Sequence, residues 1–214
     1  MIYRPDTREE WLGMRRRGIG GSDAGAVLGV NVYKNNVQLW EEKTGKIVPA
    51  DISDKPAVIF GKKAEEHLRE LFILDFPQYK VEYHEFYMYV NDEYPFIFAT
   101  LDGEITDEKG RRGILEIKTA TIQNKLQWGQ WEDKIPDSYY AQIIHQLAAT
   151  GWDFAVLKAY IRYYRDDSLR TAVRHFRIER SDVKDDIDHL IKKEAEFWSC
   201  VENNIQPALI LPDI

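Results

Sequence analysis

The sequence GILEIKT at residues 113–119, preceded by LDG at 101–103, is the part of this chain that decides the fold. Successive side chains of a β-strand point to opposite faces, so Glu116 and Lys118 share one face and the apolar residues beside them pack on the other. Asp102, on a neighbouring strand, would lie close to this pair. A carboxylate and an amine side by side, with a second carboxylate nearby, predict a Mg²⁺ and phosphate site that can hydrolyse a phosphodiester.

The oxygen ligands predicted for the metal are the carboxylates of Asp102 and Glu116 and the backbone carbonyl of Ile117. Hard divalent cations prefer oxygen, and Mg²⁺ commonly takes one or two carboxylates together with phosphate and water. Gly103, directly after the aspartate, permits a bend or a close backbone approach. Lys118 would then neutralise charge on the phosphate or lower the energy of an attacking hydroxide. The alternative for Asp102 alone is a strand-end aspartate before a turn.

A third carboxylate comes from the periodic helix predicted over residues 59–75. Its apolar stripe includes Leu68 and Phe72. Glu65 precedes these residues by three and seven positions and borders the stripe, whereas Glu66 falls nearly opposite and should face solvent. A glutamate turned inward needs a partner, which a metal ion or its water would supply. The alternative for Glu65 is an ordinary surface residue of an amphipathic helix.

Polar side chains also interrupt an apolar helix predicted over residues 137–150. Tyr139 and Gln142, at i and i+3, share a face of this helix. One interpretation places Gln142 beside the attacking water and Tyr139 near a phosphate or base. The other is a helix edge with satisfied core amides. His145 in the same helix is predicted to be structural, since no pair of histidines has metal-binding spacing.

A glycine-rich turn, GIGGS at residues 18–22, separates the helices predicted over residues 7–17 and 23–28. Ser22 is expected at the N-terminus of the second helix, where backbone N–H groups and the helix dipole favour an anion. Arg15, just upstream, could complete a pocket for a terminal phosphate. The alternative for the serine is ordinary helix capping.

The pattern along the whole chain predicts an α/β (α+β) fold in which a mixed central sheet is flanked by helices. Helices are predicted over residues 7–17, 23–28, 37–44, 59–75, 122–131, 137–150 and 181–203. Strands are predicted over residues 79–90, 96–105, 113–119, 154–164 and 171–178. We expect residues 1–214 to form a single domain.

Composition narrows the class of protein further. The single cysteine, Cys200, excludes an intramolecular disulfide and a zinc or iron–sulfur cluster built from cysteines. The start, MIYRPDTREEW, lacks the apolar region of a signal peptide, and no apolar run approaches the roughly 20 residues of a membrane span. We therefore expect an intracellular protein with no membrane partner. The net charge of −7 argues against a basic nucleic-acid coat protein, but nucleases concentrate carboxylates at their metal.

Taken in order, six motifs of this chain resemble one family. They are Trp11 to Arg15, GIGGSD with LG over residues 18–29, Gly61 to Glu65, LDG at 101–103, EIK at 116–118, and Tyr139 to Gln142. This ordered set, over about residues 8–152, is similar to the phage-type recombination exonucleases, the lambda exonuclease and YqaJ-like branch of the PD-(D/E)xK nuclease superfamily. The resemblance implies a restriction-endonuclease-like core. Residues 153–214 are expected to complete the sheet, add the C-terminal helix and support a subunit interface.

The resemblance implies a two-Mg²⁺ 5′→3′ exonuclease that acts on double-stranded DNA ends, with Mn²⁺ able to substitute. It also implies release of 5′-mononucleotides, a 3′ single-stranded overhang and a ring-shaped homotrimer that threads DNA. The roles implied for matching residues are metal ligation by Asp102, Glu116 and Glu65, catalysis by Lys118, support by Gln142 and Tyr139, and 5′-phosphate binding by Arg15 and Ser22.

Two alternatives stay open from the sequence. One is a structure-dependent endonuclease of the same superfamily, which would cut closed circular DNA, whereas an exonuclease needs an end. The other is a non-catalytic DNA-end-binding protein with a degenerate metal site. The resemblance further implies a single-strand annealing protein as a partner, and a phage or prophage protein in the cytoplasm of a bacterial host.

Overall fold

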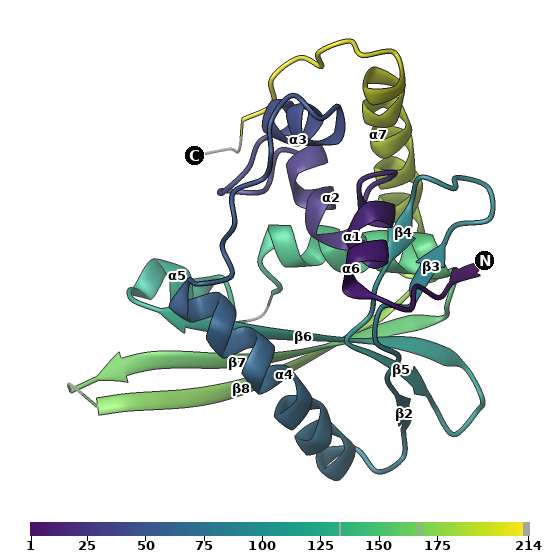
Figure 1. The fold of residues 1–214 in the computed structure, drawn as a ribbon. Helices are drawn as coiled ribbons and strands as arrows, with labels where there is room; N and C mark the ends of the chain where they lie inside the picture. Colours follow the sequence, from purple (N-terminus) through teal and green to yellow (C-terminus); the bar gives the residue numbers. More distant parts are fainter. Residues whose placement is uncertain (133, 167, 212–214) are drawn as a thin grey trace.

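The computed structural model describes residues 1–132, 134–166 and 168–211 (Figure 1). The strands are β1 (Ile2–Tyr3), β2 (Lys80–Glu82), β3 (Met88–Val90), β4 (Phe98–Ala99), β5 (Gly103–Thr106), β6 (Arg112–Ile122), β7 (Phe154–Arg165) and β8 (Ser168–Glu179). The helices are α1 (Arg8–Arg15), α2 (Gly21–Val27), α3 (Asn36–Lys43), α4 (Pro56–Asp75), α5 (Lys125–Gly129), α6 (Asp137–Thr150) and α7 (Lys184–Glu202).

Among the described residues, the strands form a large sheet of order β2–β5–β6–β7–β8 and a small one of order β1–β3–β4. The large sheet is mixed, because β6 and β7 run parallel while its other neighbours are antiparallel. Parallel strands need a crossover connection, which here contains α5 and α6. The predicted mixed sheet flanked by helices is therefore confirmed.

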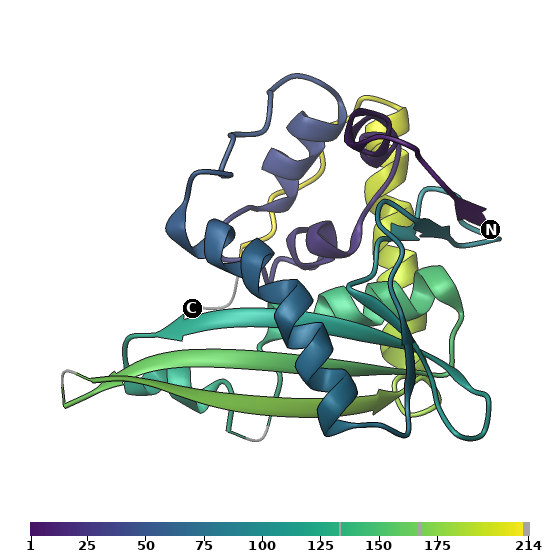
Figure 2. The ribbon, with the colours of Figure 1, turned by 60° about the horizontal axis from the view of Figure 1, so that its bottom comes forward.

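Helices cover both faces of the large sheet, as the two ribbon views show (Figures 1 and 2). On one face, Leu68 and Phe72 of α4 pack with Leu115 and Ile117 of β6. On the other face, α6 packs with Ile114 of β6. Alternate residues of β6 enter the two cores, so this strand is buried on both sides, as its apolar character indicates. Helices α2 and α7 pack in turn against α6.

Two of the predicted strands are each divided in the structure. The pattern over residues 79–90 covers both β2 and β3, and Phe86 between them has a φ of 64°. The pattern over residues 96–105 likewise covers both β4 and β5. In both places the chain crosses between the small and the large sheet. An alternating pattern does not reveal such a change of sheet, because the alternation continues through it.

The end of β6 also differs from the prediction. The strand predicted over residues 113–119 extends to Ile122, because β7 pairs with it that far. The helix predicted over residues 122–131 is correspondingly reduced to the short α5. None of the helices in the described part of the chain is long and apolar enough to cross a membrane.

Candidate functional site

The ladder between β5 and β6 ends just before the EIK motif. Its last pair is Gly103 opposite Leu115. The next N–H on that edge of β6, from Ile117, donates to Oδ2 of Asp102 at 2.8 Å. Because the N–H and C=O of one strand residue point to the same edge, the Ile117 carbonyl faces this edge as well. Asp102 thus lies in the bend before β5, not within a strand as predicted.

Glu116 is buried and accepts three hydrogen bonds. Its Oε1 accepts from Nζ of Lys118 and from Nε2 of Gln142, both at 2.6 Å. Its Oε2 accepts from Nε2 of Gln146, also at 2.6 Å. Strand alternation thus places the lysine beside the glutamate, as predicted, and α6 supplies both amides. A buried carboxylate requires such partners, since an unpaired charge away from water is costly.

Glu65 on α4 approaches the same place. It is half-buried, and its Oε1 lies 3.5 Å from Nη1 of Arg69, which also donates to the backbone carbonyl of Asp102. The guanidinium carbon of Arg69 lies 3.8 Å from the ring centroid of Tyr83. Glu66 is exposed, so the helical period correctly separated the two neighbouring glutamates.

The three carboxylates influence one another's ionisation. Burial raises the pKa of Asp102 well above its usual range, and the nearby Glu116 and Glu65 raise it further. Burial also raises the pKa of Glu65, against the opposing effect of Arg69. Burial alone would lower the pKa of Lys118, but the charges of Glu116 and Asp102 outweigh it and raise that pKa. A cation bound among these three carboxylates would therefore stabilise their ionised forms.

The donors at this point suit a hard divalent cation. Asp102, Glu116, Glu65 and the Ile117 carbonyl all present oxygen, the donor that Mg²⁺ prefers. As they are arranged here, no three His, Cys, Asp or Glu side chains of the described residues form a ready-made ion site. Both oxygens of Glu116 are engaged by protein donors. Metal binding would therefore exchange some of these hydrogen bonds for coordination.

Arg15 and Ser22 meet beside the carboxylates. Nη2 of Arg15 donates to Oγ of Ser22 at 3.1 Å, and its guanidinium carbon lies 4.6 Å from the ring of Trp11. Both residues line a pocket of about 300 Å³. The other polar residues of this pocket include Glu65, Asp102, Thr100 and Gln142. The structure thus brings the predicted phosphate-binding pair and two of the predicted metal ligands, Asp102 and Glu65, to one pocket.

Helix α2 places Ser22 in its N-terminal turn, as expected, but Ser22 is not the cap that the alternative suggested. The helix begins at Gly21, and the N–H of Gly20 donates to the carboxylate of Asp23 at 3.2 Å. Ser22 is therefore the second residue of the helix and does not cap it. A Cβ on Gly21 would lie 3.1 Å from Cγ of Gln142. The absence of a side chain at this position allows the turn to approach α6 closely.

Helix α6 presents different side chains to the site and to the core. The ring centroid of Tyr139 lies 5.5 Å from Nζ of Lys118, so Tyr139 and Gln142 face the same site, as their spacing predicts. His145 is fully buried elsewhere. Its Nδ1 lies 2.6 Å from Oε1 of Glu194 on α7, and its Nε2 lies 2.8 Å from a backbone carbonyl of β4. These contacts agree with the structural role predicted for the histidine.

Residues 10–153 match the YqaJ-like viral recombinase domain. The chain belongs to this family. The matched region contains every side chain of the site, from Arg15 to Gln146. The uncharacterized protein YqaJ of Bacillus subtilis (strain 168) is 36% identical over 193 residues, which cover 90% of this chain and 56% of that protein. The chain thus spans about half the length of this curated relative.

Solved structures share the fold of this YqaJ-like domain. The crystal structure of an alkaline exonuclease (LHK-Exo) from Laribacter hongkongensis is 21% identical, with a TM-score of 0.68 over 92% of this chain and 94% of that one. The structure of LHK-Exo in complex with dAMP is 22% identical, with a TM-score of 0.67 over the same shares. These likenesses confirm the fold class predicted from the sequence.

Two residues of the YqaJ-like domain touch the site but were not among the predicted site residues. Gln146 holds the buried glutamate, and Arg69 joins Glu65 to the carbonyl of Asp102. Gln146 follows Gln142 by four positions, so helical spacing places both on one face and could have identified it. The contact of Arg69 with Asp102 depends on how α4 crosses the sheet, which no local pattern reveals.

Proposed function

We propose that this chain is a metal-dependent 5′→3′ exonuclease acting on the ends of linear double-stranded DNA. It would release 5′-mononucleotides and leave 3′ single-stranded overhangs for phage-type recombination. Membership of the YqaJ-like viral recombinase family and a fold shared with an alkaline exonuclease support this. The observation that carries it is the meeting of Asp102, Glu116 and Lys118 where the β5–β6 ladder ends.

The metal ligands in this proposal are the carboxylates of Asp102, Glu116 and Glu65, together with the carbonyl of Ile117. They would hold two Mg²⁺ ions, and Mn²⁺ could replace them. When bound, the ions supply Lewis acidity toward the phosphate oxygens and activate the attacking water. Phosphodiesters react so slowly in water that rate gains of up to ~10¹⁷ are required. A cluster of carboxylates that binds metal ions beside one phosphate would supply the charge stabilisation that such a rate gain requires.

The protein's own donors complete the site. Lys118, whose Nζ lies 2.6 Å from Glu116, would stabilise the negative charge that builds on the phosphate during in-line attack. Gln142 would orient the attacking water while it holds Glu116 from α6. Tyr139 borders the lysine and would contact the phosphate or base of the substrate.

Arg15 and Ser22 would bind the 5′-phosphate at the end of the degraded strand. A guanidinium and a hydroxyl 3.1 Å apart can both donate to one phosphate, and hydrogen bonds between charged partners are the stronger kind. Their pocket is also lined by Asp102 and Glu65. A strand anchored there by its terminal phosphate would present its first phosphodiester bond to the carboxylates.

The wider context of the proposal follows from the family. We place the protein in the cytoplasm of a bacterial host, as a phage or prophage product. There it would act as a ring-shaped homotrimer that threads DNA, beside a single-strand annealing protein that uses the exposed 3′ strand. These statements rest on family membership alone.

The test is digestion of a linear duplex that has one 5′-phosphorylated end and one 5′-hydroxyl end, with Mg²⁺ and a different label on each strand. The proposal predicts mononucleotides from the phosphorylated strand, and a supercoiled circle that stays intact. Cleavage of the circle would show an endonuclease instead. Failure to cut either DNA with Mg²⁺ would contradict the nuclease and leave the non-catalytic DNA-end-binding alternative.

A further inference from the structure

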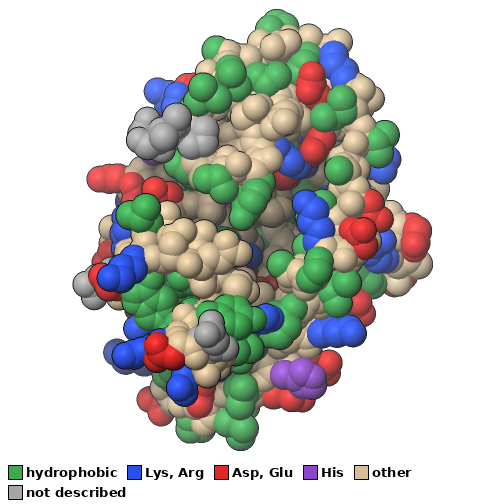
Figure 3. Space-filling model, turned by 90° about the vertical axis from the view of Figure 1, so that its left-hand side faces the viewer, with side chains coloured by type: hydrophobic (Ala, Val, Ile, Leu, Met, Phe, Trp, Pro, Cys, Tyr) green, Lys and Arg blue, Asp and Glu red, His purple; other side chains and the backbone are tan. Residues whose placement is uncertain are grey.

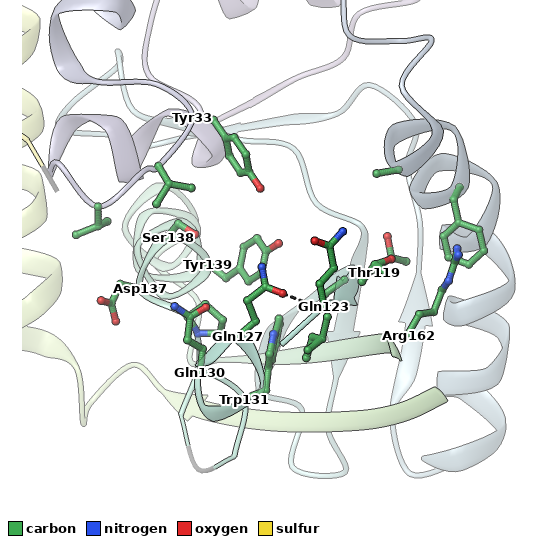
Figure 4. Close-up of a pocket in the computed structure, with 18 residues that line it drawn as sticks. Tyr33, Thr119, Gln123, Gln127, Gln130, Trp131, Asp137, Ser138, Tyr139 and Arg162 are labelled. Atoms are coloured by element: carbon green, nitrogen blue, oxygen red, sulfur yellow. Dashed lines mark hydrogen bonds between the residues drawn. The ribbon is translucent and has the colours of Figure 1, made fainter. Parts of the chain in front are cut away.

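A second cleft, of about 630 Å³, adjoins the catalytic lysine proposed above (Figure 4). It opens on the face shown in Figure 3, which is hollowed near its centre. Thr119, the residue after Lys118 in β6, lines it, and so does Tyr139, whose ring lies 5.5 Å from the lysine. No lining residue is common to this cleft and the Arg15–Ser22 pocket in the described part of the chain. The two hollows are separate branches of the site, and each has a lining residue close to Lys118 or to its partner Glu116: Tyr139 in the cleft and Gln142 in the pocket.

The second cleft is lined by both polar and apolar side chains and carries no net charge. Among the described residues, its lining contains one cation, Arg162, and one anion, Asp137. The guanidinium carbon of Arg162 lies 4.3 Å from the ring centroid of Phe60, at the α4 end of the cleft (Figure 4). Phosphate groups are bound chiefly by lysine and arginine. A cleft with a single arginine at one end is thus poorly equipped to follow a phosphate backbone.

One of the residues that line the cleft is an exposed tyrosine. Tyr33 is 94% exposed, and Figure 4 shows its ring directed from the loop before α3 toward Tyr139 on α6. An aromatic ring that packs against so little of its own protein has its faces available to a ligand. Stacking on nucleobases is a common use of such rings, and it tolerates any sequence because every base has a π face.

Three glutamines from the segment after β6 line the cleft beside this tyrosine. They are Gln123, Gln127 and Gln130. Oε1 of Gln127 accepts from the backbone N–H of Gln123 at 2.7 Å, which leaves its NH₂ group available. Within the described residues, no hydrogen bond uses the side-chain amide of Gln123 or Gln130. Each amide both donates and accepts, so it can pair with the edge of any unpaired base.

We propose that this cleft binds unpaired bases of a DNA strand next to the cleaved phosphodiester. The proposal rests on the nuclease function proposed above, since the position beside Lys118 makes the ligand part of the same polymer. Stacking on Tyr33 and hydrogen bonds to the glutamine amides require bases that are not already paired in a duplex. The branch at Arg15 and Ser22 would hold the phosphate end of the strand, and this branch would hold bases.

The test compares two single-stranded ligands that share phosphates and differ in bases. Binding of a short labelled oligothymidylate and of an abasic oligonucleotide of equal length is measured by fluorescence anisotropy, with EDTA present and the full chain intact. The wild type is expected to prefer the oligothymidylate. Tyr33→Ala should weaken its binding by about 5- to 150-fold and leave abasic binding unchanged. Gln130→Ala should act in the same direction with a smaller effect.

Matched controls use exposed residues of the same types outside the cleft. Tyr164, on β7 and 65% exposed, and Gln78, in the turn after α4, line no part of it. Tyr164→Ala and Gln78→Ala should bind both oligonucleotides as the wild type does. Because Tyr33 and Gln130 are exposed, their removal leaves the core intact, and a circular dichroism spectrum verifies this for each variant.

The outcomes separate this proposal from the nuclease function. A wild type without preference for bases, or a Tyr33→Ala variant that loses equal affinity for both ligands, would overturn the base-binding cleft. Cleavage of the linear duplex is measured in parallel with Mg²⁺. Cleavage without base preference would support the nuclease function and contradict the base-binding cleft. Base preference without cleavage would support the base-binding cleft and contradict the nuclease function.

Discussion

Replacement of Gln146 by methionine tests whether the amides of α6 hold the buried carboxylate of the site. The amide donates to Oε2 of Glu116 at 2.6 Å, and both residues are 1% exposed. Methionine has similar length and volume, so Gln146→Met removes the donor and leaves little cavity. Oε2 of Glu116 then stays buried without its partner.

The expected loss of unfolding free energy depends on the charge of the acceptor, Glu116. A hydrogen bond to a charged group contributes about 1.5–3 kcal/mol, and one to a neutral group about 0.5–1.5 kcal/mol. Gln146→Met should therefore lower the free energy of unfolding by about 1.5–3 kcal/mol, which for a chain of this size corresponds to a Tm lower by about 3–12 °C. In a Glu116→Gln background the same change should cost about 1 kcal/mol less, because the acceptor is then neutral.

Urea denaturation of the four proteins of this cycle, without metal and followed by circular dichroism, measures both quantities. Gln206→Met, at an exposed position near the C-terminus, is the control and should change the free energy by less than about 0.5 kcal/mol. An equal cost of Gln146→Met in both backgrounds would show that Gln146 does not stabilise the charge of Glu116. A cost as small as that of the control would show that the hydrogen bond contributes nothing measurable.

Three further predictions concern the core, the α2–α6 contact and the phosphate pocket. The pKa of His145 is raised, since its glutamate partner outweighs the opposing effect of burial. The stability it contributes should therefore be complete below about pH 6.5 and be lost as pH rises through the folded-state pKa. Urea unfolding between about pH 6 and 9 should show this decline in the wild type and not in His145→Gln. Gly21→Val should press on Gln142 and lower the free energy of unfolding by about 1–3 kcal/mol, whereas Gly13→Ala, which meets nothing within 4 Å, should leave the α2–α6 contact intact. Arg15→Ala should abolish the preference for a 5′-phosphorylated over a 5′-hydroxyl end, seen as a ratio of KM values about 10- to 150-fold smaller; an unchanged ratio would exclude Arg15 from the phosphate pocket.

The features that sequence alone predicted well are those with a local period. Strand alternation placed Glu116 beside Lys118, and helical spacing placed Tyr139 with Gln142 on one face. The same period correctly turned Glu65, rather than its neighbour, toward the carboxylates. In each case the relevant neighbours lie within seven residues, so one element fixes their relation.

The features that the sequence did not reveal depend on how elements meet. Asp102 lies in a bend because β5 begins only at Gly103, and only the length of the ladder determines this. Arg69 reaches Asp102 because α4 crosses the sheet at that point. The glutamine-lined cleft arises because β6 extends to Ile122 beside β7 and shortens the following helix. Tyr33 joins it from a loop far away in sequence.

The most direct test of the central claim is the cleavage of a 5′-phosphorylated linear duplex by Lys118→Ala, measured with Mg²⁺ under single-turnover conditions. Affinity for the same duplex is measured in EDTA. Lys109→Ala, an exposed lysine in the turn between β5 and β6, is the control. We expect Lys118→Ala to bind DNA like the wild type without cleaving it, and Lys109→Ala to bind and cleave it. Cleavage by Lys118→Ala at the wild-type rate would contradict the site proposed here.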